Sequence, residues 1–417
     1  MFILKKKMKS NHKNLIKKLI SNYSFQENRT YPLSADSFSD DDLIEGIKII
    51  LSKRLTMSKV TKKFEEEFAK FIGSKYALMV NSGSSANLLA MFASINPMRK
   101  NRAKYGDEAL IPSLCWSTSL WPIVQAGLKP KFVDIDTETL NVSSDQFIKK
   151  ITKKTKVIMG VHVLGNSGEI DKIQKICKKK KIILLEDTCE SLGSKYKKKN
   201  LGTYGDFGTF SFYYSHQMTS GEGGMIICND KKDYDILRML RSHGWSRGLN
   251  NNKKNDFNFI NSGFNLRPTD IVASIGFSQL KKIKKLIRDR SNNRKKIIKS
   301  IVNSKNWDNQ FSFIQPAKHI TPSWFGLPII LKSKYKKKKS KFLKFLNKNG
   351  VETRPIISGN FLNQPAIKLY GLNKKLNLFK NAQKIEELGF FIGLHIKPID
   401  NSNLNKLKNL LLKISKL

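Results

Sequence analysis

A turn rich in glycine and serine follows one of the short apolar runs of the chain. Residues 76–80 form the apolar run, and residues 81–85 (Asn-Ser-Gly-Ser-Ser) follow it and open an apolar helix. Free backbone N–H groups and the helix dipole favour an anion at such a helix start. Gly83 permits close approach of the backbone, and the serines add hydroxyl donors. The turn predicts a phosphate site, although Ser and Asn are also common helix caps.

A carboxylate and an indole follow two other predicted strands. Asp187 lies just past the apolar run at 182–185, and Trp116 follows a strand at 109–112. Ligands of open α/β sheets gather at the carboxyl ends of the strands. A carboxylate there pairs with a cationic ring nitrogen, and an indole stacks on a flat ring. Taken alone, Asp187 is more often a cap or a solvent-exposed acid, and Trp116 more often belongs to the core.

An imidazole lies between these segments and a glycine-rich run. His216 follows Ser211 by five residues and precedes residues 220–224 (Ser-Gly-Glu-Gly-Gly), which permit tight backbone near a ligand. Ser211 adds a possible donor to a phosphate. Histidine moves protons near neutral pH. A lone histidine is usually structural, so the neighbouring segments are what make His216 a candidate general base.

In order and spacing, these segments resemble the DegT/DnrJ/EryC1/StrS family from Tyr31 to about Ile399. The resemblance implies the aspartate-aminotransferase-like fold, pyridoxal 5′-phosphate (PLP) and its pyridoxamine form (PMP) as cofactor, and a homodimer with shared active sites. In that family the position of His216 is a lysine that holds the cofactor as a Schiff base. An imidazole cannot form that bond, so the histidine favours proton abstraction and elimination over transamination.

The same resemblance assigns roles by position, with His216 as the catalytic base. The implied cofactor-binding residues are Gly83, Ser84 and Ser211 for the phosphate, Trp116 on the ring, Asp187 at the ring nitrogen, Glu190 near the ring hydroxyl, and Asn265 reaching the phosphate from the other subunit. A guanidinium fork suits both carboxylates and diphosphates. The candidate substrate-binding residues are His243, Arg247, Arg267 and Arg354.

Two branches of the family carry the histidine, and both are nucleotide-sugar 3-dehydratases. One acts on GDP-4-keto-6-deoxymannose. The other acts on CDP-4-keto-6-deoxyglucose and carries an iron–sulfur cluster on closely spaced cysteines that this chain lacks. Residues 243–247, 322–326, 353–361 and 391–395 resemble the GDP branch. Gln217, where that branch has a second histidine, and the Gln-Pro pair at 364–365 depart from it.

The expected reaction is glutamate-dependent removal of the C3 hydroxyl from a nucleotide-linked 4-keto-6-deoxyhexose for 3,6-dideoxysugar biosynthesis. GDP-4-keto-6-deoxymannose is the preferred substrate, L-glutamate the amino donor, and His216 the base, with a pKa near neutrality. Three alternatives remain: a CDP-type enzyme without the cluster, a sugar 4-aminotransferase with a displaced lysine, and a non-catalytic nucleic-acid binder. No CxxC pair occurs, so neither a metal site nor an iron–sulfur cluster is expected.

Short apolar strands that alternate with helices predict an α/β fold with a mixed, mostly parallel sheet covered on both faces. A basic extension is expected at residues 1–30, a large cofactor-binding domain at 31–285 and a small C-terminal domain at 286–417. A lysine-rich helix over residues 280–300 is predicted to link the two domains.

Charge and hydropathy limit the possible partners. The net charge of +44 arises from lysine runs spread along the whole chain, which is typical of solvated faces rather than of a nucleic-acid site. Such a surface still favours the approach of an anionic nucleotide. No apolar run of 18–20 residues occurs, and the basic N-terminus lacks an apolar signal-peptide region. We therefore expect a cytoplasmic protein that binds neither a membrane nor nucleic acid.

Overall fold

The structure is a computed structural model. It describes residues 10–23, 28–35, 37–247, 249, 257–372 and 376–417. Of the predicted N-terminal extension, residues 1–9 and 24–27 lie outside the described residues. Within it, α1 (Ser10–Tyr23) contains no buried residue. No helix in the described ranges is long and apolar enough to cross a membrane.

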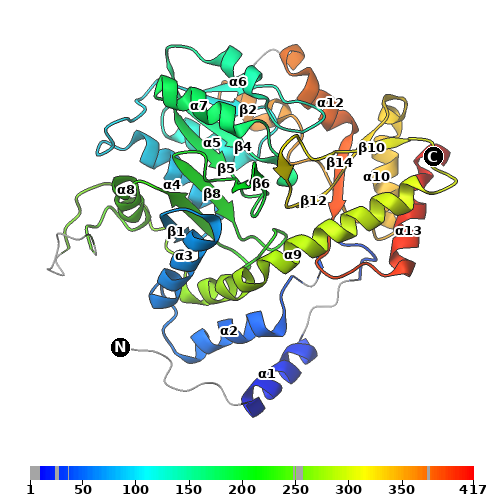
Figure 1. Cartoon of the computed structure of the whole chain (residues 1–417), viewed down its shortest axis with the longest axis horizontal. Coiled ribbons are helices and arrows are strands. Elements are labelled where there is room, and N and C mark those ends of the chain that lie inside the picture. The colour runs from blue at the N-terminus through cyan, green and yellow to red at the C-terminus, as the bar shows by residue number, and fades with distance from the viewer. Residues whose placement is uncertain (1–9, 24–27, 36, 248, 250–256, 373–375) are drawn as a thin grey trace.

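A seven-stranded sheet forms the centre of the larger part of the molecule (Figure 1). Its order is β1-β9-β8-β5-β4-β2-β3, and only β9 runs antiparallel to its neighbours. All but β3 are made almost wholly of buried residues, as the apolar runs predict. The strands are β1 (Tyr76–Val80), β2 (Glu108–Pro112), β3 (Lys129–Val133), β4 (Thr155–Val161), β5 (Ile183–Asp187), β8 (Phe207–Ser211) and β9 (Gly224–Cys228).

Helices cover both faces of this sheet, because right-handed crossovers in opposite directions along the sheet place their helices on opposite sides. α5 lies in the crossover from β2 to β3, whereas α6 and α7 lie in crossovers that return towards β5. The helices of this part are α2 (Asp40–Leu51), α3 (Lys59–Ile72), α4 (Gly83–Ile95), α5 (Ser117–Gln125), α6 (Ser144–Lys150), α7 (Ile170–Lys180) and α8 (Lys231–Arg241).

The long helix α9 (Asp270–Val302) runs from the first part to a second sheet (Figure 1). This sheet is antiparallel, in the order β10-β12-β14-β13. A three-stranded sheet, β11-β6-β7, pairs one strand of the second part with two strands of the first. The remaining elements are β6 (Lys195–Tyr196), β7 (Lys199–Asn200), β10 (Phe311–Phe313), β11 (Ile320–Thr321), β12 (Gly326–Leu331), β13 (Thr353–Arg354), β14 (Gly389–Gly393), α10 (Lys339–Lys348), α11 (Pro365–Leu369), α12 (Lys380–Leu388) and α13 (Asn401–Leu411).

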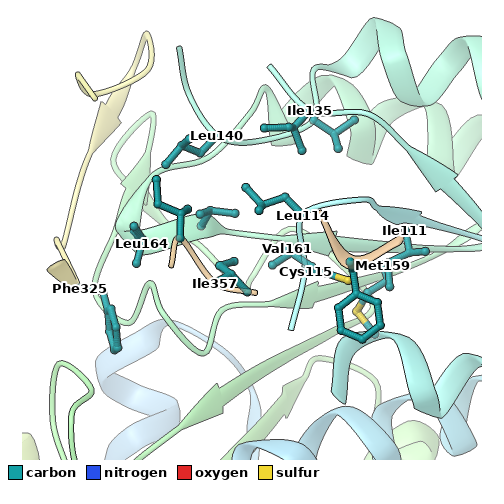
Figure 2. Close-up of a cluster of buried hydrophobic side chains, with 14 of the residues drawn as sticks. Ile111, Leu114, Cys115, Ile135, Leu140, Met159, Val161, Leu164, Phe325 and Ile357 are labelled. Atoms are coloured by element: carbon teal, nitrogen blue, oxygen red, sulfur yellow. The ribbon is translucent and has the colours of Figure 1, made fainter. Parts of the chain in front are cut away.

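One continuous apolar core joins the two parts beneath the carboxyl ends of the strands. Figure 2 shows side chains from β2, from β4 and from the loops after β2, β3 and β4, together with Phe325 and Ile357 of the C-terminal part. The labelled residues, all buried, are Ile111, Leu114, Cys115, Ile135, Leu140, Met159, Val161, Leu164, Phe325 and Ile357. This packing fixes the loops that follow the strands.

The predicted α/β class and the mixed, mostly parallel sheet are confirmed. Two element bounds differ from the predictions. β5 extends through Asp187, so this residue ends the strand rather than following it. The linking helix begins at Asp270, ten residues earlier than predicted, and residue 285, the predicted domain boundary, lies within it.

Candidate active site

The turn after β1 brings a helix start and a strand end together. Ser82 caps α4, since its hydroxyl accepts from the N–H of Ser85 at 3.1 Å. A Cβ added to Gly83 would lie 2.5 Å from the Cβ of Ser211, the last residue of β8, so a larger residue does not fit there. The exposed Ser84 hydroxyl lies 3.3 Å from that of Thr118. Free N–H groups and hydroxyls thus form an anion cradle.

Asp187 is a buried carboxylate with three donors. Its Oδ2 accepts from Asn87 of α4 and from Ser119 of α5, each at 2.7 Å, and its Oδ1 accepts from the N–H of Cys189 at 3.2 Å. Asn87 is itself held by the hydroxyl of Thr209 at 2.6 Å. These bonds fix the carboxylate in one orientation at the carboxyl end of the sheet.

Sequence reasoning missed Asn87 and Ser119. Both lie within the first five residues of a helix that directly follows a strand of the same sheet. A polar side chain at the start of such a helix, next to a predicted strand end, is the sequence signal that could have identified them. Ser119 also connects Asp187 to Trp116, whose carbonyl accepts from the Ser119 N–H. Trp116 precedes α5 and is 55% exposed, which leaves an indole surface available for stacking beside the carboxylate.

His216 lies in the loop between β8 and β9. Its ring packs edge-on against Phe325 at 5.0 Å and against Tyr213 at 5.9 Å between centroids. Its Nδ1 is buried and has no hydrogen-bond partner among the described residues. Burial, aided by the positive charge of Arg290, lowers the pKa of His216 to about 3. This is below the near-neutral pKa expected from the sequence, so the ring is neutral across the physiological range.

Glu190 lies shortly after Asp187 in the chain and contacts the loop between β8 and β9 that carries His216. The Glu190 carboxylate accepts from the N–H of Leu164 at 3.0 Å. Burial, aided by the charge of Asp187, raises the pKa of Glu190 to about 7. The amide of Gln217, next to His216, donates to the carbonyls of Glu190 and Ser323.

Three of the candidate substrate-binding residues lie on one exposed segment with Asn265. His243 has a positive φ of 62°, and the next residue, Gly244, continues the left-handed turn. The Arg247 guanidinium stacks on the Trp245 ring at 5.0 Å. Arg267 donates to Asn265 at 3.0 Å. These two flank Leu266, whose carbonyl accepts from the N–H of Asn81, so this part of the segment lies beside the anion cradle of its own chain.

Arg354 lies apart from this group. It is in β13 and forms an ion pair with Glu352 at 2.7 Å, in which its side chain remains half exposed. Four residues after Arg354, the Ser358 hydroxyl donates at 2.7 Å to the carbonyl of Cys115, which is the residue before Trp116.

Taken together, the cradle, the fixed carboxylate, the exposed indole and the neutral imidazole fit a flat, phosphorylated heteroaromatic ring with a cationic nitrogen. The donors at Gly83, Ser84 and Ser211 suit a phosphate, and the buried Nδ1 of His216 is an unsatisfied polar atom of the kind that a bound group pairs with. Within the described ranges, no group of three or more His, Cys, Asp or Glu side chains could hold a metal ion.

Comparisons with known proteins agree with this chemistry. The model of the DegT/DnrJ/EryC1/StrS aminotransferase family matches residues 39–399. The GDP-4-keto-6-deoxy-D-mannose 3-dehydratase of Escherichia coli O55:H7 is 38% identical over 376 residues, which is 88% of this chain and 95% of that protein.

Solved structures of such enzymes are similar along nearly the whole chain. The E. coli GDP-4-keto-6-deoxy-D-mannose-3-dehydratase with bound hydrated PLP superposes with a TM-score of 0.85 at 36% identity, covering 92% of this chain and 100% of that one. Another GDP-4-keto-6-deoxymannose-3-dehydratase structure, with a trapped PLP-glutamate geminal diamine, has a TM-score of 0.83 at 36% identity and covers 91% and 100%.

Proposed function

Because the chain belongs to the DegT/DnrJ/EryC1/StrS aminotransferase family and has its aspartate-aminotransferase-like fold, we propose that it is a PLP- and PMP-dependent nucleotide-sugar 3-dehydratase. Its best substrate is GDP-4-keto-6-deoxymannose. The observation that carries the proposal is a histidine, His216, in place of the cofactor-binding lysine within an otherwise complete cofactor site.

Each part of the site has a role in holding the cofactor. The α4 start with Gly83, Ser84 and Ser211 binds the phosphate, Asp187 pairs with the ring nitrogen, and Trp116 covers one face of the ring. When bound, the cofactor supplies an electron sink that weakens bonds next to the attached substrate carbon. The donors on Asp187 keep its carboxylate directed at the nitrogen, which preserves that property.

His216 moves the proton. At a ring nitrogen, the neutral imidazole would accept the proton lost from C4′ of the bound cofactor, and the imidazolium would then donate it to the hydroxyl that leaves C3 of the sugar. Such general acid–base help contributes about 10² to 10⁴ in rate. The low pKa in the apolar contact with Phe325 keeps the base neutral but makes it weak, and an anionic group bound beside the ring would raise the pKa towards neutrality.

The proposal also names the amino donor and the oligomeric state. L-glutamate is the donor, which is supported by the relative whose structure contains PLP joined to glutamate. The active form is a cytoplasmic homodimer. Exposed apolar side chains on the segment after α8, Phe257, Phe259 and Ile260, support an interface there. Asn265 reaches the phosphate of the partner, and His243, Arg247, Arg267 and Arg354 bind the carboxylate and diphosphate anions.

A paired substrate assay tests the reaction. The protein is given GDP- and CDP-linked 4-keto-6-deoxy sugars, each with and without glutamate, and mass spectrometry follows the loss of water. We expect glutamate-dependent loss of water from the GDP sugar. Preference for the CDP sugar would assign the chain to the other histidine-carrying branch. Amino transfer without loss of water, with cofactor trapped on the protein by borohydride, would identify a sugar aminotransferase with a displaced lysine.

A further inference from the structure

We propose that Arg290 is a positioning residue for the base, His216, and that it acts from α9 through the backbone that carries the imidazole. The inference rests on the proposed function in giving His216 the proton transfer. It adds a residue from a helix that contributes none of the cofactor contacts described above.

Arg290 is buried, at 4% exposure, and points its guanidinium at three carbonyls. Its Nη2 donates to the carbonyl of His216 at 2.7 Å and to that of Ser215 at 3.4 Å, and its Nη1 donates to the carbonyl of Phe325 at 3.2 Å. One rigid fork therefore ties together the β8–β9 loop, α9 and the residue before β12.

These contacts hold the imidazole from two sides. The bonds to His216 and Ser215 fix the backbone from which the ring projects, and the bond to Phe325 fixes the aromatic ring that packs edge-on against it at 5.0 Å. Figure 2 shows Phe325 beside Leu164 at the margin of the buried core, so the second support is itself anchored. Loss of the Arg290 guanidinium would release both the loop backbone and the Phe325 ring, which together define the position of the imidazole.

The charge of Arg290 also affects the protonation state of His216. A cation next to the ring opposes protonation of the imidazole, so His216 stays in the neutral form that accepts a proton, although its basicity is lowered. Tyr213, on the same loop, is an ionisable side chain that also contacts the ring. Burying a guanidinium is costly, and the bonds to the three carbonyls offset part of that cost.

Arg294, one turn further along α9, offers a matched control. It is also buried, the Nε of neither arginine has a partner among the described residues, and burial lowers the pKa of both guanidinium groups to about 10. Arg294 donates to the carbonyl of Ile314 and lies over the Trp324 ring at 4.2 Å, away from the imidazole loop. Arg290→Met and Arg294→Met therefore remove the same group from the same helix, and only the first removes the bonds to His216.

The experiment compares Arg290→Met, Arg290→Lys and Arg294→Met as the full chain loaded with cofactor. We expect Arg290→Met to lower kcat about 10- to 100-fold while KM and cofactor affinity change less than about twofold, because the binding groups remain in place and a misplaced catalytic group costs about 10². Arg290→Lys recovers part of the loss, since an ammonium still donates to the His216 carbonyl. Arg294→Met retains kcat.

Hydrogen–deuterium exchange on the cofactor-free proteins tests, independently of catalysis, whether Arg290 holds the β8–β9 loop in place. Arg290→Met should speed amide exchange in residues 213–220 about tenfold or more, and Arg294→Met should not. Equal effects of the two Met variants on kcat, or unchanged exchange and kcat in Arg290→Met, would overturn the proposal. If the variants show the expected difference in exchange but the wild type removes no water from the sugar, the proposed function is wrong. The role of Arg290 in positioning the loop would then still stand.

Discussion

At the scale of residues, we propose that His216 decides between dehydration and transamination, because its neighbours suit either reaction. The cradle around Gly83 and the carboxylate of Asp187 would hold the cofactor equally well for transamination. We expect His216→Lys to lose dehydration and to gain 4-aminotransferase activity, since a lysine amine binds the cofactor covalently and returns the proton to carbon. Mass spectrometry of the sugar product distinguishes loss of water from gain of an amine.

His216→Asn is the control for this change, because it retains a polar side chain of similar length. It should bind cofactor with wild-type absorbance and lose about 10² to 10⁴ in turnover. Dehydration by His216→Lys at the wild-type rate would show that the assigned role is wrong.

The resemblance to the family implies that Glu190 lies near the ring hydroxyl of the cofactor, and its pKa gives a reason why a carboxyl can serve there. With a pKa near 7, Glu190 is largely protonated below that pH and can donate a hydrogen bond as an amide does. As pH rises through 7 the carboxyl ionises and the donor is lost. We therefore predict that cofactor affinity of the wild type falls between pH 7 and 9, by at most about tenfold per pH unit.

Glu190→Gln should remove this pH dependence, which cofactor titrations by absorbance between pH 6 and 9 would measure. The exposed Glu138 provides a control, and Glu138→Gln should retain the wild-type profile. Identical profiles for Glu190→Gln and the wild type would exclude a donor role for the Glu190 carboxyl.

At the scale of elements, the phosphate site depends on how closely α4 approaches β8. Gly83→Ala would place a methyl group 2.5 Å from the Cβ of Ser211, and we expect the cofactor dissociation constant to rise about tenfold or more. Gly160→Ala in β4 is the control, because the nearest atom to its added methyl is 3.7 Å away. Equilibrium dialysis with PLP measures both.

Ser84→Ala separates the loss of a donor from the strain of the added methyl. Ser84 is exposed, so its removal leaves the fold unchanged and should weaken binding by about 1 kcal/mol. If Gly83→Ala and Ser84→Ala both bind PLP with wild-type affinity, the cradle does not hold the phosphate.

Elements whose bounds are set by the local sequence could be predicted, whereas bounds and residues that depend on contacts distant in the chain could not. The short apolar strands and the turn at 81–85 are visible in the sequence, because each is a run of buried residues followed by helix-capping residues. The first ten residues of α9 were missed. Its start is fixed by Asp270, which accepts from Ser58 and Thr61 more than two hundred positions earlier in the chain. The same holds for Asn87, Ser119 and Arg290, whose roles depend on strand order and on helix placement.

At the scale of the whole molecule, the proposed homodimer requires that Asn265 serve the active site of a second copy rather than its own. The Leu266 carbonyl accepts from Asn81 of the same chain, which places this segment beside its own cradle. The exposed Phe257 and Phe259 of the same segment favour a second copy against it. A symmetric dimer that buries this segment would bring Asn265 near the phosphate site of the second copy as well as its own.

Mixed dimers of two inactive chains decide the question. One chain carries His216→Asn and the other Asn265→Asp, each with its own affinity tag, and dimers with both tags are isolated. If Asn265 acts on the partner, one of the two sites in each mixed dimer has both side chains intact, and the isolated mixed dimers show about half of wild-type dehydration. If it acts within its own chain, both sites stay defective and no activity returns. Recovery of activity requires a dimer, so this one measurement tests the assembly together with the assignment of Asn265. A monomer in solution, or mixed dimers as inactive as their parents, would contradict the shared site.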